Sequence, residues 1–347
     1  MRPKSTPLTR IAAGAYELGT KARKLAYDIG LVKAVKVDRP VISIGNITAG
    51  GAGKTPLTIL LVQWLQARGL KVCVLSRGYG AQEPPSDRPR IVCDGETILE
   101  NAARSGDEPQ MIAQRTKACV VVYPNRVEAA QLAIDALEPD VFVLDDGFQH
   151  WRLERDLNIL IMDAREPLGN GQLLPAGPLR ESPEAVERAH LIAVNHGPTI
   201  AEETNMEFES WAPNFEVRMS PQDVCTLAGD EAEDCVSLAG QKVYLVSGIA
   251  RPERFKETLE NLGAEVLAHK AYGDHYNISE GELSRDLEQA EKLGADCVLI
   301  TEKDAARMTP RLHTNLPLKV LRMEMEVYAG ADILDEALGR LLGERQR

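Results

Sequence analysis

The sequence predicts an α/β fold: a doubly wound, mostly parallel sheet, with a second, smaller α/β domain after it and a basic amphipathic helix before it. Two observations lead to this prediction. Short apolar runs rich in β-branched residues recur every ~25–35 residues and alternate with segments of helical period. The first of these runs opens into a glycine-rich turn. We expect the helical segment at 1–40, the first domain at 41–235 and the smaller domain at 236–347.

The composition limits the classes of function. The chain has 347 residues, of which 44% are hydrophobic and 27% charged, as in ordinary globular proteins. A net charge of −12 argues against nonspecific nucleic-acid binding. We expect no spanning helix and no export signal, since no apolar run approaches ~18 residues. The six cysteines form no C-x-x-C pair and mostly lie in strand-like runs, so we expect reduced core thiols of a cytoplasmic protein.

The first 40 residues are basic, with nine Lys or Arg against three Asp or Glu. Apolar residues between Leu8 and Val35 recur at helical spacing, interrupted by Gly14, Gly19 and Gly30. A basic amphipathic helix of this kind can lie on an anionic membrane surface. The alternative is a helix packed on the body of the protein with a solvated basic face, and the residues alone leave both open.

The segment from Val41 to Leu57 is the clearest functional signal. A β-branched run predicts a buried strand, a glycine turn follows it, and apolar residues after Lys54 recur at helical spacing. Strand, turn and helix together point backbone N–H groups at one anion, which is the phosphate loop of a P-loop NTPase-type fold. We expect Lys54 to reach the β- and γ-phosphates of ATP and the Thr55 hydroxyl to bind Mg²⁺. The residues expected to bind the nucleotide are Thr48, Ala49, Gly50, Gly51, Ala52, Gly53, Lys54 and Thr55.

This loop departs from the general phosphate-loop pattern at one position, because Thr48 stands where that pattern has glycine. Gly50 and Gly51 still permit a close approach of the backbone to phosphate. The competing interpretation is a glycine turn before a core helix.

Two further segments supply candidate substrate and catalytic residues. A strand over 71–76 ends in a turn that holds Arg77 and Tyr79, and loops at such strand ends line the ligand crevice of open α/β sheets. After a solvent loop over 81–90, Asp107 and Glu108 precede a helix over 110–117 and a strand over 118–123. Arg77 in a tight turn, and Asp107 as a helix cap, are the structural alternatives. The functional alternative is that Asp107 accepts a proton from a substrate hydroxyl.

A helix over 127–137 and a strand from Asp140 lead to the adjacent carboxylates Asp145 and Asp146. An acidic residue at the tip of a strand beside a phosphate loop reaches Mg²⁺ directly or through water. Two neighbouring carboxylates need a cation or hydrogen-bond donors, so we expect at least one of them to hold the metal.

The remaining segments continue the α/β alternation. Strands are expected over 157–162 and 189–194, with an ordered Gly- and Pro-rich loop over 169–181 that opens a helix at Ser182. Residues 197–235 look irregular and acidic and are expected to form a linker or an edge. The smaller domain has expected strands over 242–247, 265–268 and 297–301 and helices over 252–262 and 280–293. Its loop over 272–277 contains Asp274 and His275; a loop histidine is usually solvated.

Seven runs of the chain, read together, resemble the tetraacyldisaccharide 4′-kinase family of lipid A biosynthesis. They are GNITAGGAGKTP, LSRGYG, GDEPQMIA, VLDDGFQHWRLERDLNILIMDA, GNGQLLPAGPLRE, YGDHYNIS and LITEKDAARM, and they follow the family order. The runs around Asp145 and Glu181 are the most specific. In this family Thr48 is the family's own form of the loop.

The resemblance implies an ATP- and Mg²⁺-dependent kinase that phosphorylates the 4′-hydroxyl of a tetraacyl disaccharide 1-phosphate, the lipid A precursor. It implies a peripheral protein on the anionic cytoplasmic face of the inner membrane, with its active site between two domains and no obligate protein partner. Lys54 and Thr55 would hold phosphate and metal, Asp145 and Asp146 the metal, and Asp107 with His275 would form a catalytic pair. Residues similar to those that line the family's site are Tyr79, Arg126, Gln149, His150 and Glu181.

Two other functions remain open at this stage. One is a regulatory or assembly NTPase without a lipid substrate, although such proteins often carry a lysine where this chain has Ala49. The run Thr301-Glu-Lys-Asp also places its lysine one position late for a guanine-reading motif. The other is a membrane-associated nucleotide-binding scaffold without turnover.

Overall fold

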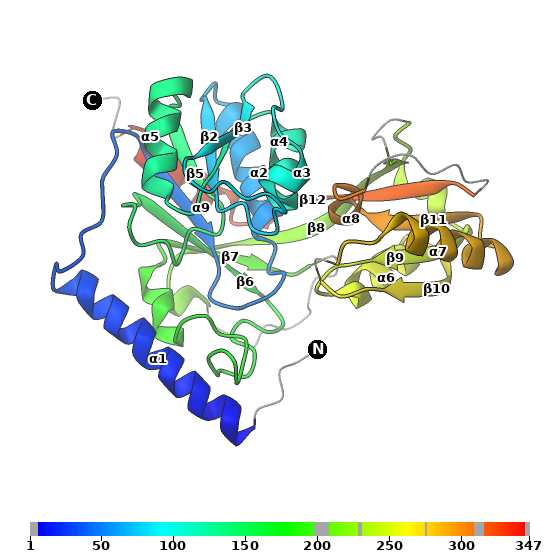
Figure 1. Ribbon diagram of the computed structural model, residues 1–347, viewed down its shortest axis with the longest axis horizontal. Coiled ribbons are helices and arrows are strands. Elements are labelled where there is room, and N and C mark those ends of the chain that lie inside the picture. The colour runs from blue at the N-terminus through cyan, green and yellow to red at the C-terminus, as the bar shows by residue number, and fades with distance from the viewer. Residues whose placement is uncertain (1–5, 198–207, 228–230, 275, 309–315, 344–347) are drawn as a thin grey trace.

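The computed structural model describes residues 6–197, 208–227, 231–274, 276–308 and 316–343 (Figure 1). His275, a predicted site residue, lies outside this part of the chain. Within the described residues a single 12-stranded sheet runs through both lobes in the order β10-β9-β11-β12-β8-β7-β6-β1-β5-β2-β4-β3. Most of its neighbouring strands are parallel, which confirms the predicted mixed α/β class with a large, mostly parallel sheet.

The larger lobe contains the first predicted sheet. Its strands are β1 (Val41–Gly45), β2 (Val72–Ser76), β3 (Arg90–Asp94), β4 (Cys119–Val122), β5 (Val141–Leu144), β6 (Leu157–Asp163) and β7 (Leu191–Asn195). Strand β1 pairs on one side with β5 and on the other with β6, all parallel. Because parallel strands end at the same edge, this pairing brings the residues after β1 and after β5 together.

Helices cover both faces of this sheet. They are α2 (Lys54–Gln66), α3 (Ala102–Ser105), α4 (Asp107–Thr116), α5 (Arg126–Leu137), the 3₁₀ segments Pro183–Arg188 and Phe208–Ser210, and α9 (Ala331–Gly343). Helix α2 places Leu57, Leu61 and Leu65 in a buried cluster with the strands, each at most 2% exposed. This burial confirms the helix predicted after Lys54 and anchors its first residue rigidly.

The expectation of a linker or edge over residues 197–235 is wrong where the structure describes them. Residues Asn214–Thr226 form a long strand, β8, between β7 and β12 (Leu318–Ala329) in the middle of the sheet. Only Phe215, Val217, Val224 and Cys225 of β8 are buried, so its sequence lacks a continuous apolar run. Pro221 also lacks an N–H, and the register of the antiparallel β8–β12 pair shifts opposite it. The sequence of this polar strand, which contains a proline, therefore resembles that of a linker.

The β8–β12 pair joins the two lobes. Phe215 and Val217 of β8 lie in the core cluster of the larger lobe, whereas Val224 lies in that of the smaller lobe. After β12 the chain returns, and Leu334 and Leu338 of α9 pack into the core of the larger lobe. Strand β12 and helix α9 are not among the elements predicted from the sequence. The domain bounds at 40 and 235 stay a prediction.

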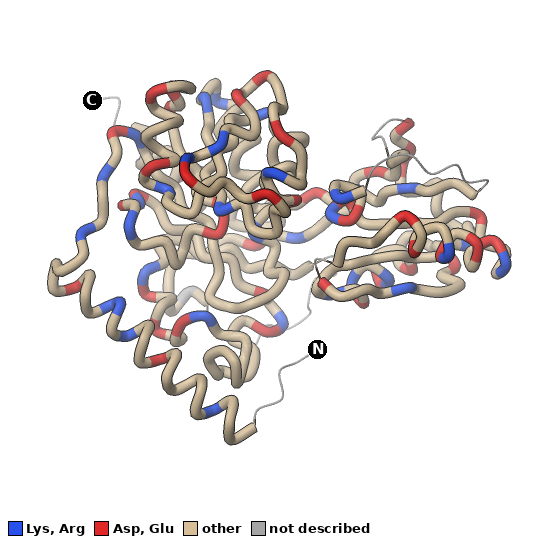
Figure 2. The backbone as a smooth tube through the Cα atoms, in the orientation of Figure 1, with Lys and Arg blue, Asp and Glu red and all other residues tan. Residues whose placement is uncertain are grey.

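The smaller lobe repeats the strand–helix alternation that the sequence predicts. It contains β9 (Lys242–Ser247), α6 (Pro252–Asn261), β10 (Glu265–Ala271), α7 (Glu280–Lys292), β11 (Cys297–Thr301) and α8 (Glu302–Ala305), after the 3₁₀ segment Cys235–Leu238. Strands β10, β9, β11 and β12 are parallel neighbours. In Figure 2 blue and red residues lie side by side where this lobe meets the larger one.

Helix α1 (Pro7–Asp28) runs along the outside of the larger lobe (Figure 1). It starts at a capping box between Thr6 and Thr9 and continues through the predicted interruptions at Gly14 and Gly19. One face contacts the body: Ala13 is buried, Tyr16 donates to the Arg180 carbonyl at 2.9 Å, and Tyr27 packs edge-on against Trp151. The predicted amphipathic N-terminal helix is therefore present.

The opposite face of α1 is apolar and uncovered. Its large exposed residues are Leu8, Ile11, Leu18 and Leu25, each between 57% and 77% exposed. On the flank, Lys21 and Lys24 pair with acids one turn away, Glu17 at 2.6 Å and Asp28 at 2.5 Å. In the described chain, no helix combines the length and the apolarity needed to cross a bilayer.

The six cysteines are all buried and unbridged. Burial raises the pKa of the Cys73 thiol well above its ordinary value. Free core thiols are what the scattered spacing predicts.

Candidate active site

The conformation of the glycine loop depends on the backbone angles of Gly53 and on a hydrogen bond from Asn195 at the end of β7. Gly53 adopts φ 96°, a left-handed conformation that favours glycine, and α2 begins at the next residue. A Cβ at Gly53 would lie 2.6 Å from Nδ2 of Asn195, which donates to the Ala52 carbonyl at 2.8 Å. The first turn of α2 has no side-chain cap, so its N–H groups face the loop. The geometry is that of an anion cradle.

The loop divides into two parts. Thr48 forms an isolated bridge with Leu179, and the Ala49 N–H donates to the Pro178 carbonyl at 2.6 Å. Thr48, which replaces the glycine of the general pattern, thus anchors the loop to the 169–181 segment. The residues from Gly50 to Thr55 line a cavity instead.

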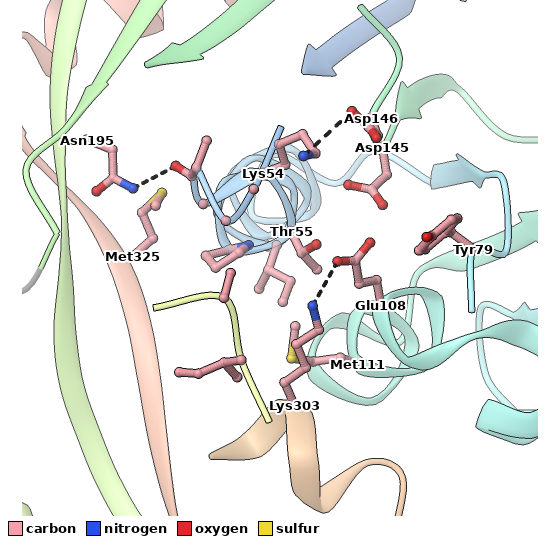
Figure 3. Close-up of a pocket in the computed structure, with 18 of the residues that line it drawn as sticks. Lys54, Thr55, Tyr79, Glu108, Met111, Asp145, Asp146, Asn195, Lys303 and Met325 are labelled. Carbon is pink, nitrogen blue, oxygen red and sulfur yellow. Dashed lines mark hydrogen bonds and ion pairs between the residues drawn. The ribbon is translucent and has the colours of Figure 1, made fainter. Parts of the chain in front are cut away.

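This cavity of about 950 Å³ lies between the lobes and extends to α1. Figure 3 shows Lys54, Thr55, Tyr79, Asp145 and Asp146 around it. Three groups of lining residues come from distant parts of the chain. They are Tyr16 and Arg23 of α1; Arg126, Gln149 and His150 of the larger lobe; and Asp274 and Lys303 of the smaller lobe. The fold therefore brings most of the predicted site residues to one cavity.

The phosphate-loop lysine faces the acidic pair. Lys54 Nζ lies 3.7 Å from Asp146 Oδ1 (Figure 3). It also lies 3.3 Å from Oδ1 of Asn46. Arg180 donates to both oxygens of Asp146 at 2.9 Å. Burial opposes ionisation of Asp146, but the Lys54 and Arg180 cations outweigh it and lower its pKa.

Asp145 has a different environment although it is the neighbouring residue. It is 1% exposed and accepts from the hydroxyls of Thr58 at 3.2 Å and Ser76 at 3.4 Å. Burial, with the charge of Glu108 adding to it, raises the pKa of Asp145 to about 7. The turn that follows Asp145 packs closely against Gly45 at the end of β1, because a Cβ on Gly45 would lie 2.6 Å from Cβ of Phe148.

The donor set fits a hard divalent cation. A buried carboxylate with a raised pKa is the group that a bound cation would stabilise most, and the Thr55 hydroxyl lies in the same cavity. No group of three or more His, Cys, Asp or Glu that could hold a metal occurs among the described residues. The metal would therefore rely on few protein ligands plus phosphate oxygens, as Mg²⁺ does with nucleotides.

Asp107 and Glu108 open α4 and both reach the smaller lobe. Arg307 contacts Asp107 Oδ2 through Nη2 at 2.5 Å and Nε at 3.2 Å, and Lys303 lies 3.4 Å from Glu108 (Figure 3). Asp107 is 5% exposed and is not among the described residues that line the cavity, whereas Glu108 lines it. Both acids lie in the first turn of α4, but the N-cap is Gly106 and no side chain caps the helix, so Asp107 is not the predicted cap. Its role as a proton acceptor stays a prediction.

The expected substrate residues differ in burial and position. Tyr79 is 67% exposed at the cavity, whereas Arg126 is 3% exposed and its Nε has no hydrogen-bond partner. Burial lowers the pKa of Arg126 to about 10. Burial and the nearby Arg126 cation lower the pKa of His150 to about 3, so the imidazole is neutral. Gln149 donates to the Asn46 carbonyl at 2.8 Å.

Glu181 is not a cavity residue. It pairs at 2.7 Å with Arg188, whose guanidinium lies over the rings of Phe148 and Trp151 at 4.6 and 4.7 Å. It supports the turn that carries Gln149 and His150. The sequence reasoning assigned no function to Asn46, Arg180, Asn195 and Arg307; three of these lie inside runs quoted for the resemblance, and Asn195 had no sequence signal.

Comparisons with known proteins agree with this geometry. Residues 6–342 match the family described as Tetraacyldisaccharide-1-P 4′-kinase. The chain is 40% identical to the tetraacyldisaccharide 4′-kinase of Anaeromyxobacter dehalogenans strain 2CP-C, covering 94% of this chain and 88% of the relative. It is 39% identical to that of Geobacter sulfurreducens, covering 96% and 92%. It is also similar to the crystal structure of "apo" form LpxK from Aquifex aeolicus in complex with ATP: TM-score 0.77, 29% identity, covering 95% of this chain and 97% of that one.

Proposed function

The chain belongs to the Tetraacyldisaccharide-1-P 4′-kinase family, and on this premise we propose that its cavity transfers the γ-phosphate of ATP to the 4′-hydroxyl of a tetraacyl disaccharide 1-phosphate. The enzyme is a kinase of lipid A biosynthesis. The observation that supports the assignment is the shared cavity, because the phosphate loop, the acidic pair and two residues of α1 line one volume. A nucleotide and a glycolipid head group can meet there.

The loop Gly50–Thr55 and Lys54 bind the triphosphate of ATP. Backbone N–H groups and the N-terminus of α2 attract the phosphate charge, and Lys54 reaches its outer oxygens. In the described arrangement Lys54 is held by Asp146, so this ion pair is replaced when phosphate enters. Arg180 keeps a cation on Asp146 during that exchange.

Thr55, Asp145 and Asp146 would hold the Mg²⁺ that kinases require, and the ion would offset charge on the phosphates. Asp145 must be ionised to bind it, whereas burial favours its protonated form. Thr58 and Ser76 orient the Asp145 carboxylate through their hydroxyls.

Asp107 accepts the proton of the 4′-hydroxyl. As the proton leaves, the hydroxyl oxygen bonds to the γ-phosphorus and the bond from that phosphorus to the bridging oxygen of ADP breaks. The family resemblance pairs His275 with Asp107, and Asp274, the residue before it in the sequence, lines the cavity. Tyr79, Arg126, Gln149 and His150 would contact the disaccharide, and Glu181 would act through Arg188.

Helix α1 carries the enzyme to its lipid substrate. Its uncovered apolar face is opposite the face that contacts the body, and Tyr16 and Arg23 extend from it into the cavity. Burial of such a face in the interface of a bilayer would place the cavity beside the acyl chains. We propose a peripheral location on the anionic cytoplasmic face of the inner membrane.

Incubation of the enzyme with γ-labelled ATP and the tetraacyl disaccharide 1-phosphate in mixed micelles tests the proposal. Label should enter the lipid in the wild type, and Asp107→Asn should lower kcat by about 10²–10⁴-fold without changing ATP binding. ATP hydrolysis without lipid labelling would indicate a regulatory NTPase instead. Nucleotide binding without any turnover would indicate a scaffold.

A further inference from the structure

Arg307 connects the proton acceptor of one lobe to the loop of the other. It follows α8 in the smaller lobe, and its Nε and Nη2 both contact Oδ2 of Asp107. Its Nη1 lies 3.4 Å from the carbonyl oxygen of Tyr276, in the loop that carries Asp274. The Arg307 side chain is 12% exposed, so the pair is shielded from water. The reaction described above gives this residue no function.

Arg307 is itself fixed by a buried carboxylate. Asp304 is 2% exposed, accepts from the Gly248 N–H at 3.1 Å and from the Thr301 hydroxyl at 2.6 Å, and lies 3.6 Å from Nη1 of Arg307. Gly248 follows β9 and Thr301 ends β11, so the anchor belongs to the core of the smaller lobe. The position of Arg307 is therefore set by that lobe.

The contact is directional. Arg307 contacts Oδ2, whereas Oδ1 lies beside Gly80, where a Cβ would be 3.4 Å from it. Gly80 belongs to the turn that carries Tyr79, a residue on the cavity wall. The rigid guanidinium places two N–H donors on Oδ2, which fixes the position of that oxygen and with it the direction in which the carboxylate extends.

We propose that Arg307 is a positioning residue for phosphoryl transfer: it orients the Asp107 carboxylate toward the acceptor hydroxyl and does so only when the lobes are together. This inference rests on the proposed function of Asp107 as proton acceptor. Asp107 belongs to the larger lobe and Arg307 to the smaller, so separation of the lobes removes the partner that aligns the carboxylate. Proton abstraction is then coupled to lobe closure, which keeps an aligned base away from water.

A double-mutant cycle on the full-length enzyme tests this positioning. The variants are Arg307→Gln, Asp107→Asn and the double variant, assayed with labelled ATP and lipid precursor at saturation. Arg307→Gln should lower kcat by about 10–10²-fold, the size of effect that misplacement of a reacting group produces, with KM for ATP unchanged. The double variant should lose no more than Asp107→Asn alone, since Arg307 acts through Asp107.

Each outcome of the cycle has one meaning. If the two losses multiply, Arg307 acts independently and the proposal is wrong. If Asp107→Asn is impaired but Arg307→Gln equals the wild type, the proposal is also wrong, while the function of Asp107 stands. If Asp107→Asn keeps full kcat, it is the proposed proton acceptor that fails.

Two further variants separate positioning from stability. Arg307→Lys retains the charge but loses the fork, so it should fold like the wild type and recover only part of kcat; full recovery would contradict the proposal. It also replaces Arg307→Gln in the cycle if that variant does not fold. Arg322→Gln removes a comparable arginine–aspartate pair, with Asp223 at 2.6 Å on the β8–β12 ribbon outside the cavity, and should leave kcat unchanged.

Discussion

The two sides of the cavity are built in different ways. On the nucleotide side, Asn46, Lys54 and the loop between them come from one short segment, and the Asn195 side chain and the Pro178 carbonyl of the same lobe hold the loop in place. On the acceptor side, Arg307 and Asp107 are 200 positions apart, and Lys303 and Glu108 are 195 apart. The first side is a local motif, whereas the second exists only when two lobes are together. The nucleotide side should therefore tolerate changes in how the two lobes meet, and the acceptor side should not.

The largest expected effect is the loss of the loop lysine. Lys54→Ala removes the cation expected to contact the outer phosphates and should lower kcat by about 10³-fold, the size seen when a preorganised charge or donor is removed. Lipid labelling under saturating ATP measures it. The matched change Lys71→Ala, at an exposed lysine away from the cavity, should be silent. A loss below about tenfold for Lys54→Ala would mean that the loop is not the nucleotide site.

The next-largest effect concerns the contact of helix α1 with lipid. Leu18→Asp places a charge in the uncovered apolar face of α1 and should weaken binding to anionic phospholipid vesicles by about 10–100-fold, since a buried leucine contributes about 1.5–3 kcal/mol. Vesicle sedimentation measures it, with ATP affinity unchanged. Leu99→Asp, at a leucine 53% exposed in the larger lobe, is the control. Equal vesicle binding by Leu18→Asp and wild type would remove α1 from the membrane contact.

A smaller effect tests the backbone shape of the loop. Gly53→Ala introduces a Cβ in a left-handed conformation and against Asn195, at a cost of about 1–3 kcal/mol. ATP affinity, measured by calorimetry, should fall by about tenfold. Gly339→Ala in α9, where no atom lies within 4 Å of the added Cβ, should leave affinity unchanged. Wild-type affinity in Gly53→Ala would show that the loop is not preshaped.

The smallest effect is a pH dependence of stability. The pKa of His150 is about 3 in the folded chain, against an ordinary value of 6.5. Below pH 6.5 the unfolded chain therefore binds a proton that the folded chain excludes, and stability is lost as the pH falls from 6.5 toward 3. His150→Gln should flatten this decline between pH 6.5 and 5, measured by urea denaturation. If the free energy of unfolding declined with pH equally in the wild type and in His150→Gln, the interpretation of His150 as a neutral, buried imidazole would be wrong.

The contrast between the two sides also explains what the sequence predicts. The strand, turn and helix around Lys54 are consecutive, so residue types and spacing suffice to predict the cradle. Asp145 and Asp146 are predictable because they directly follow a strand, β5, which pairs with β1. By contrast, the binding of Thr48 to the 169–181 segment and the Asp107–Arg307 pair depend on long-range packing, which no local pattern carries.

The largest error of the sequence reasoning has the same physical origin. Strand β8 is only partly covered and contains Pro221, so its residues lack the apolar run that a central strand usually shows. It is held by pairing with β7 and with β12, and β12 lies about a hundred residues later in the chain. Glu181 was expected to line the site and instead supports Arg188, because a conspicuous motif does not reveal which way its side chain faces.

The unbroken sheet bears on how the enzyme denatures. Strands β8 and β12 contribute side chains to the cores of both lobes, so neither lobe can melt without stripping hydrogen bonds and apolar contacts from the other. Calorimetry should record one heat-absorption peak, and a protease should find no stable half-molecule to release.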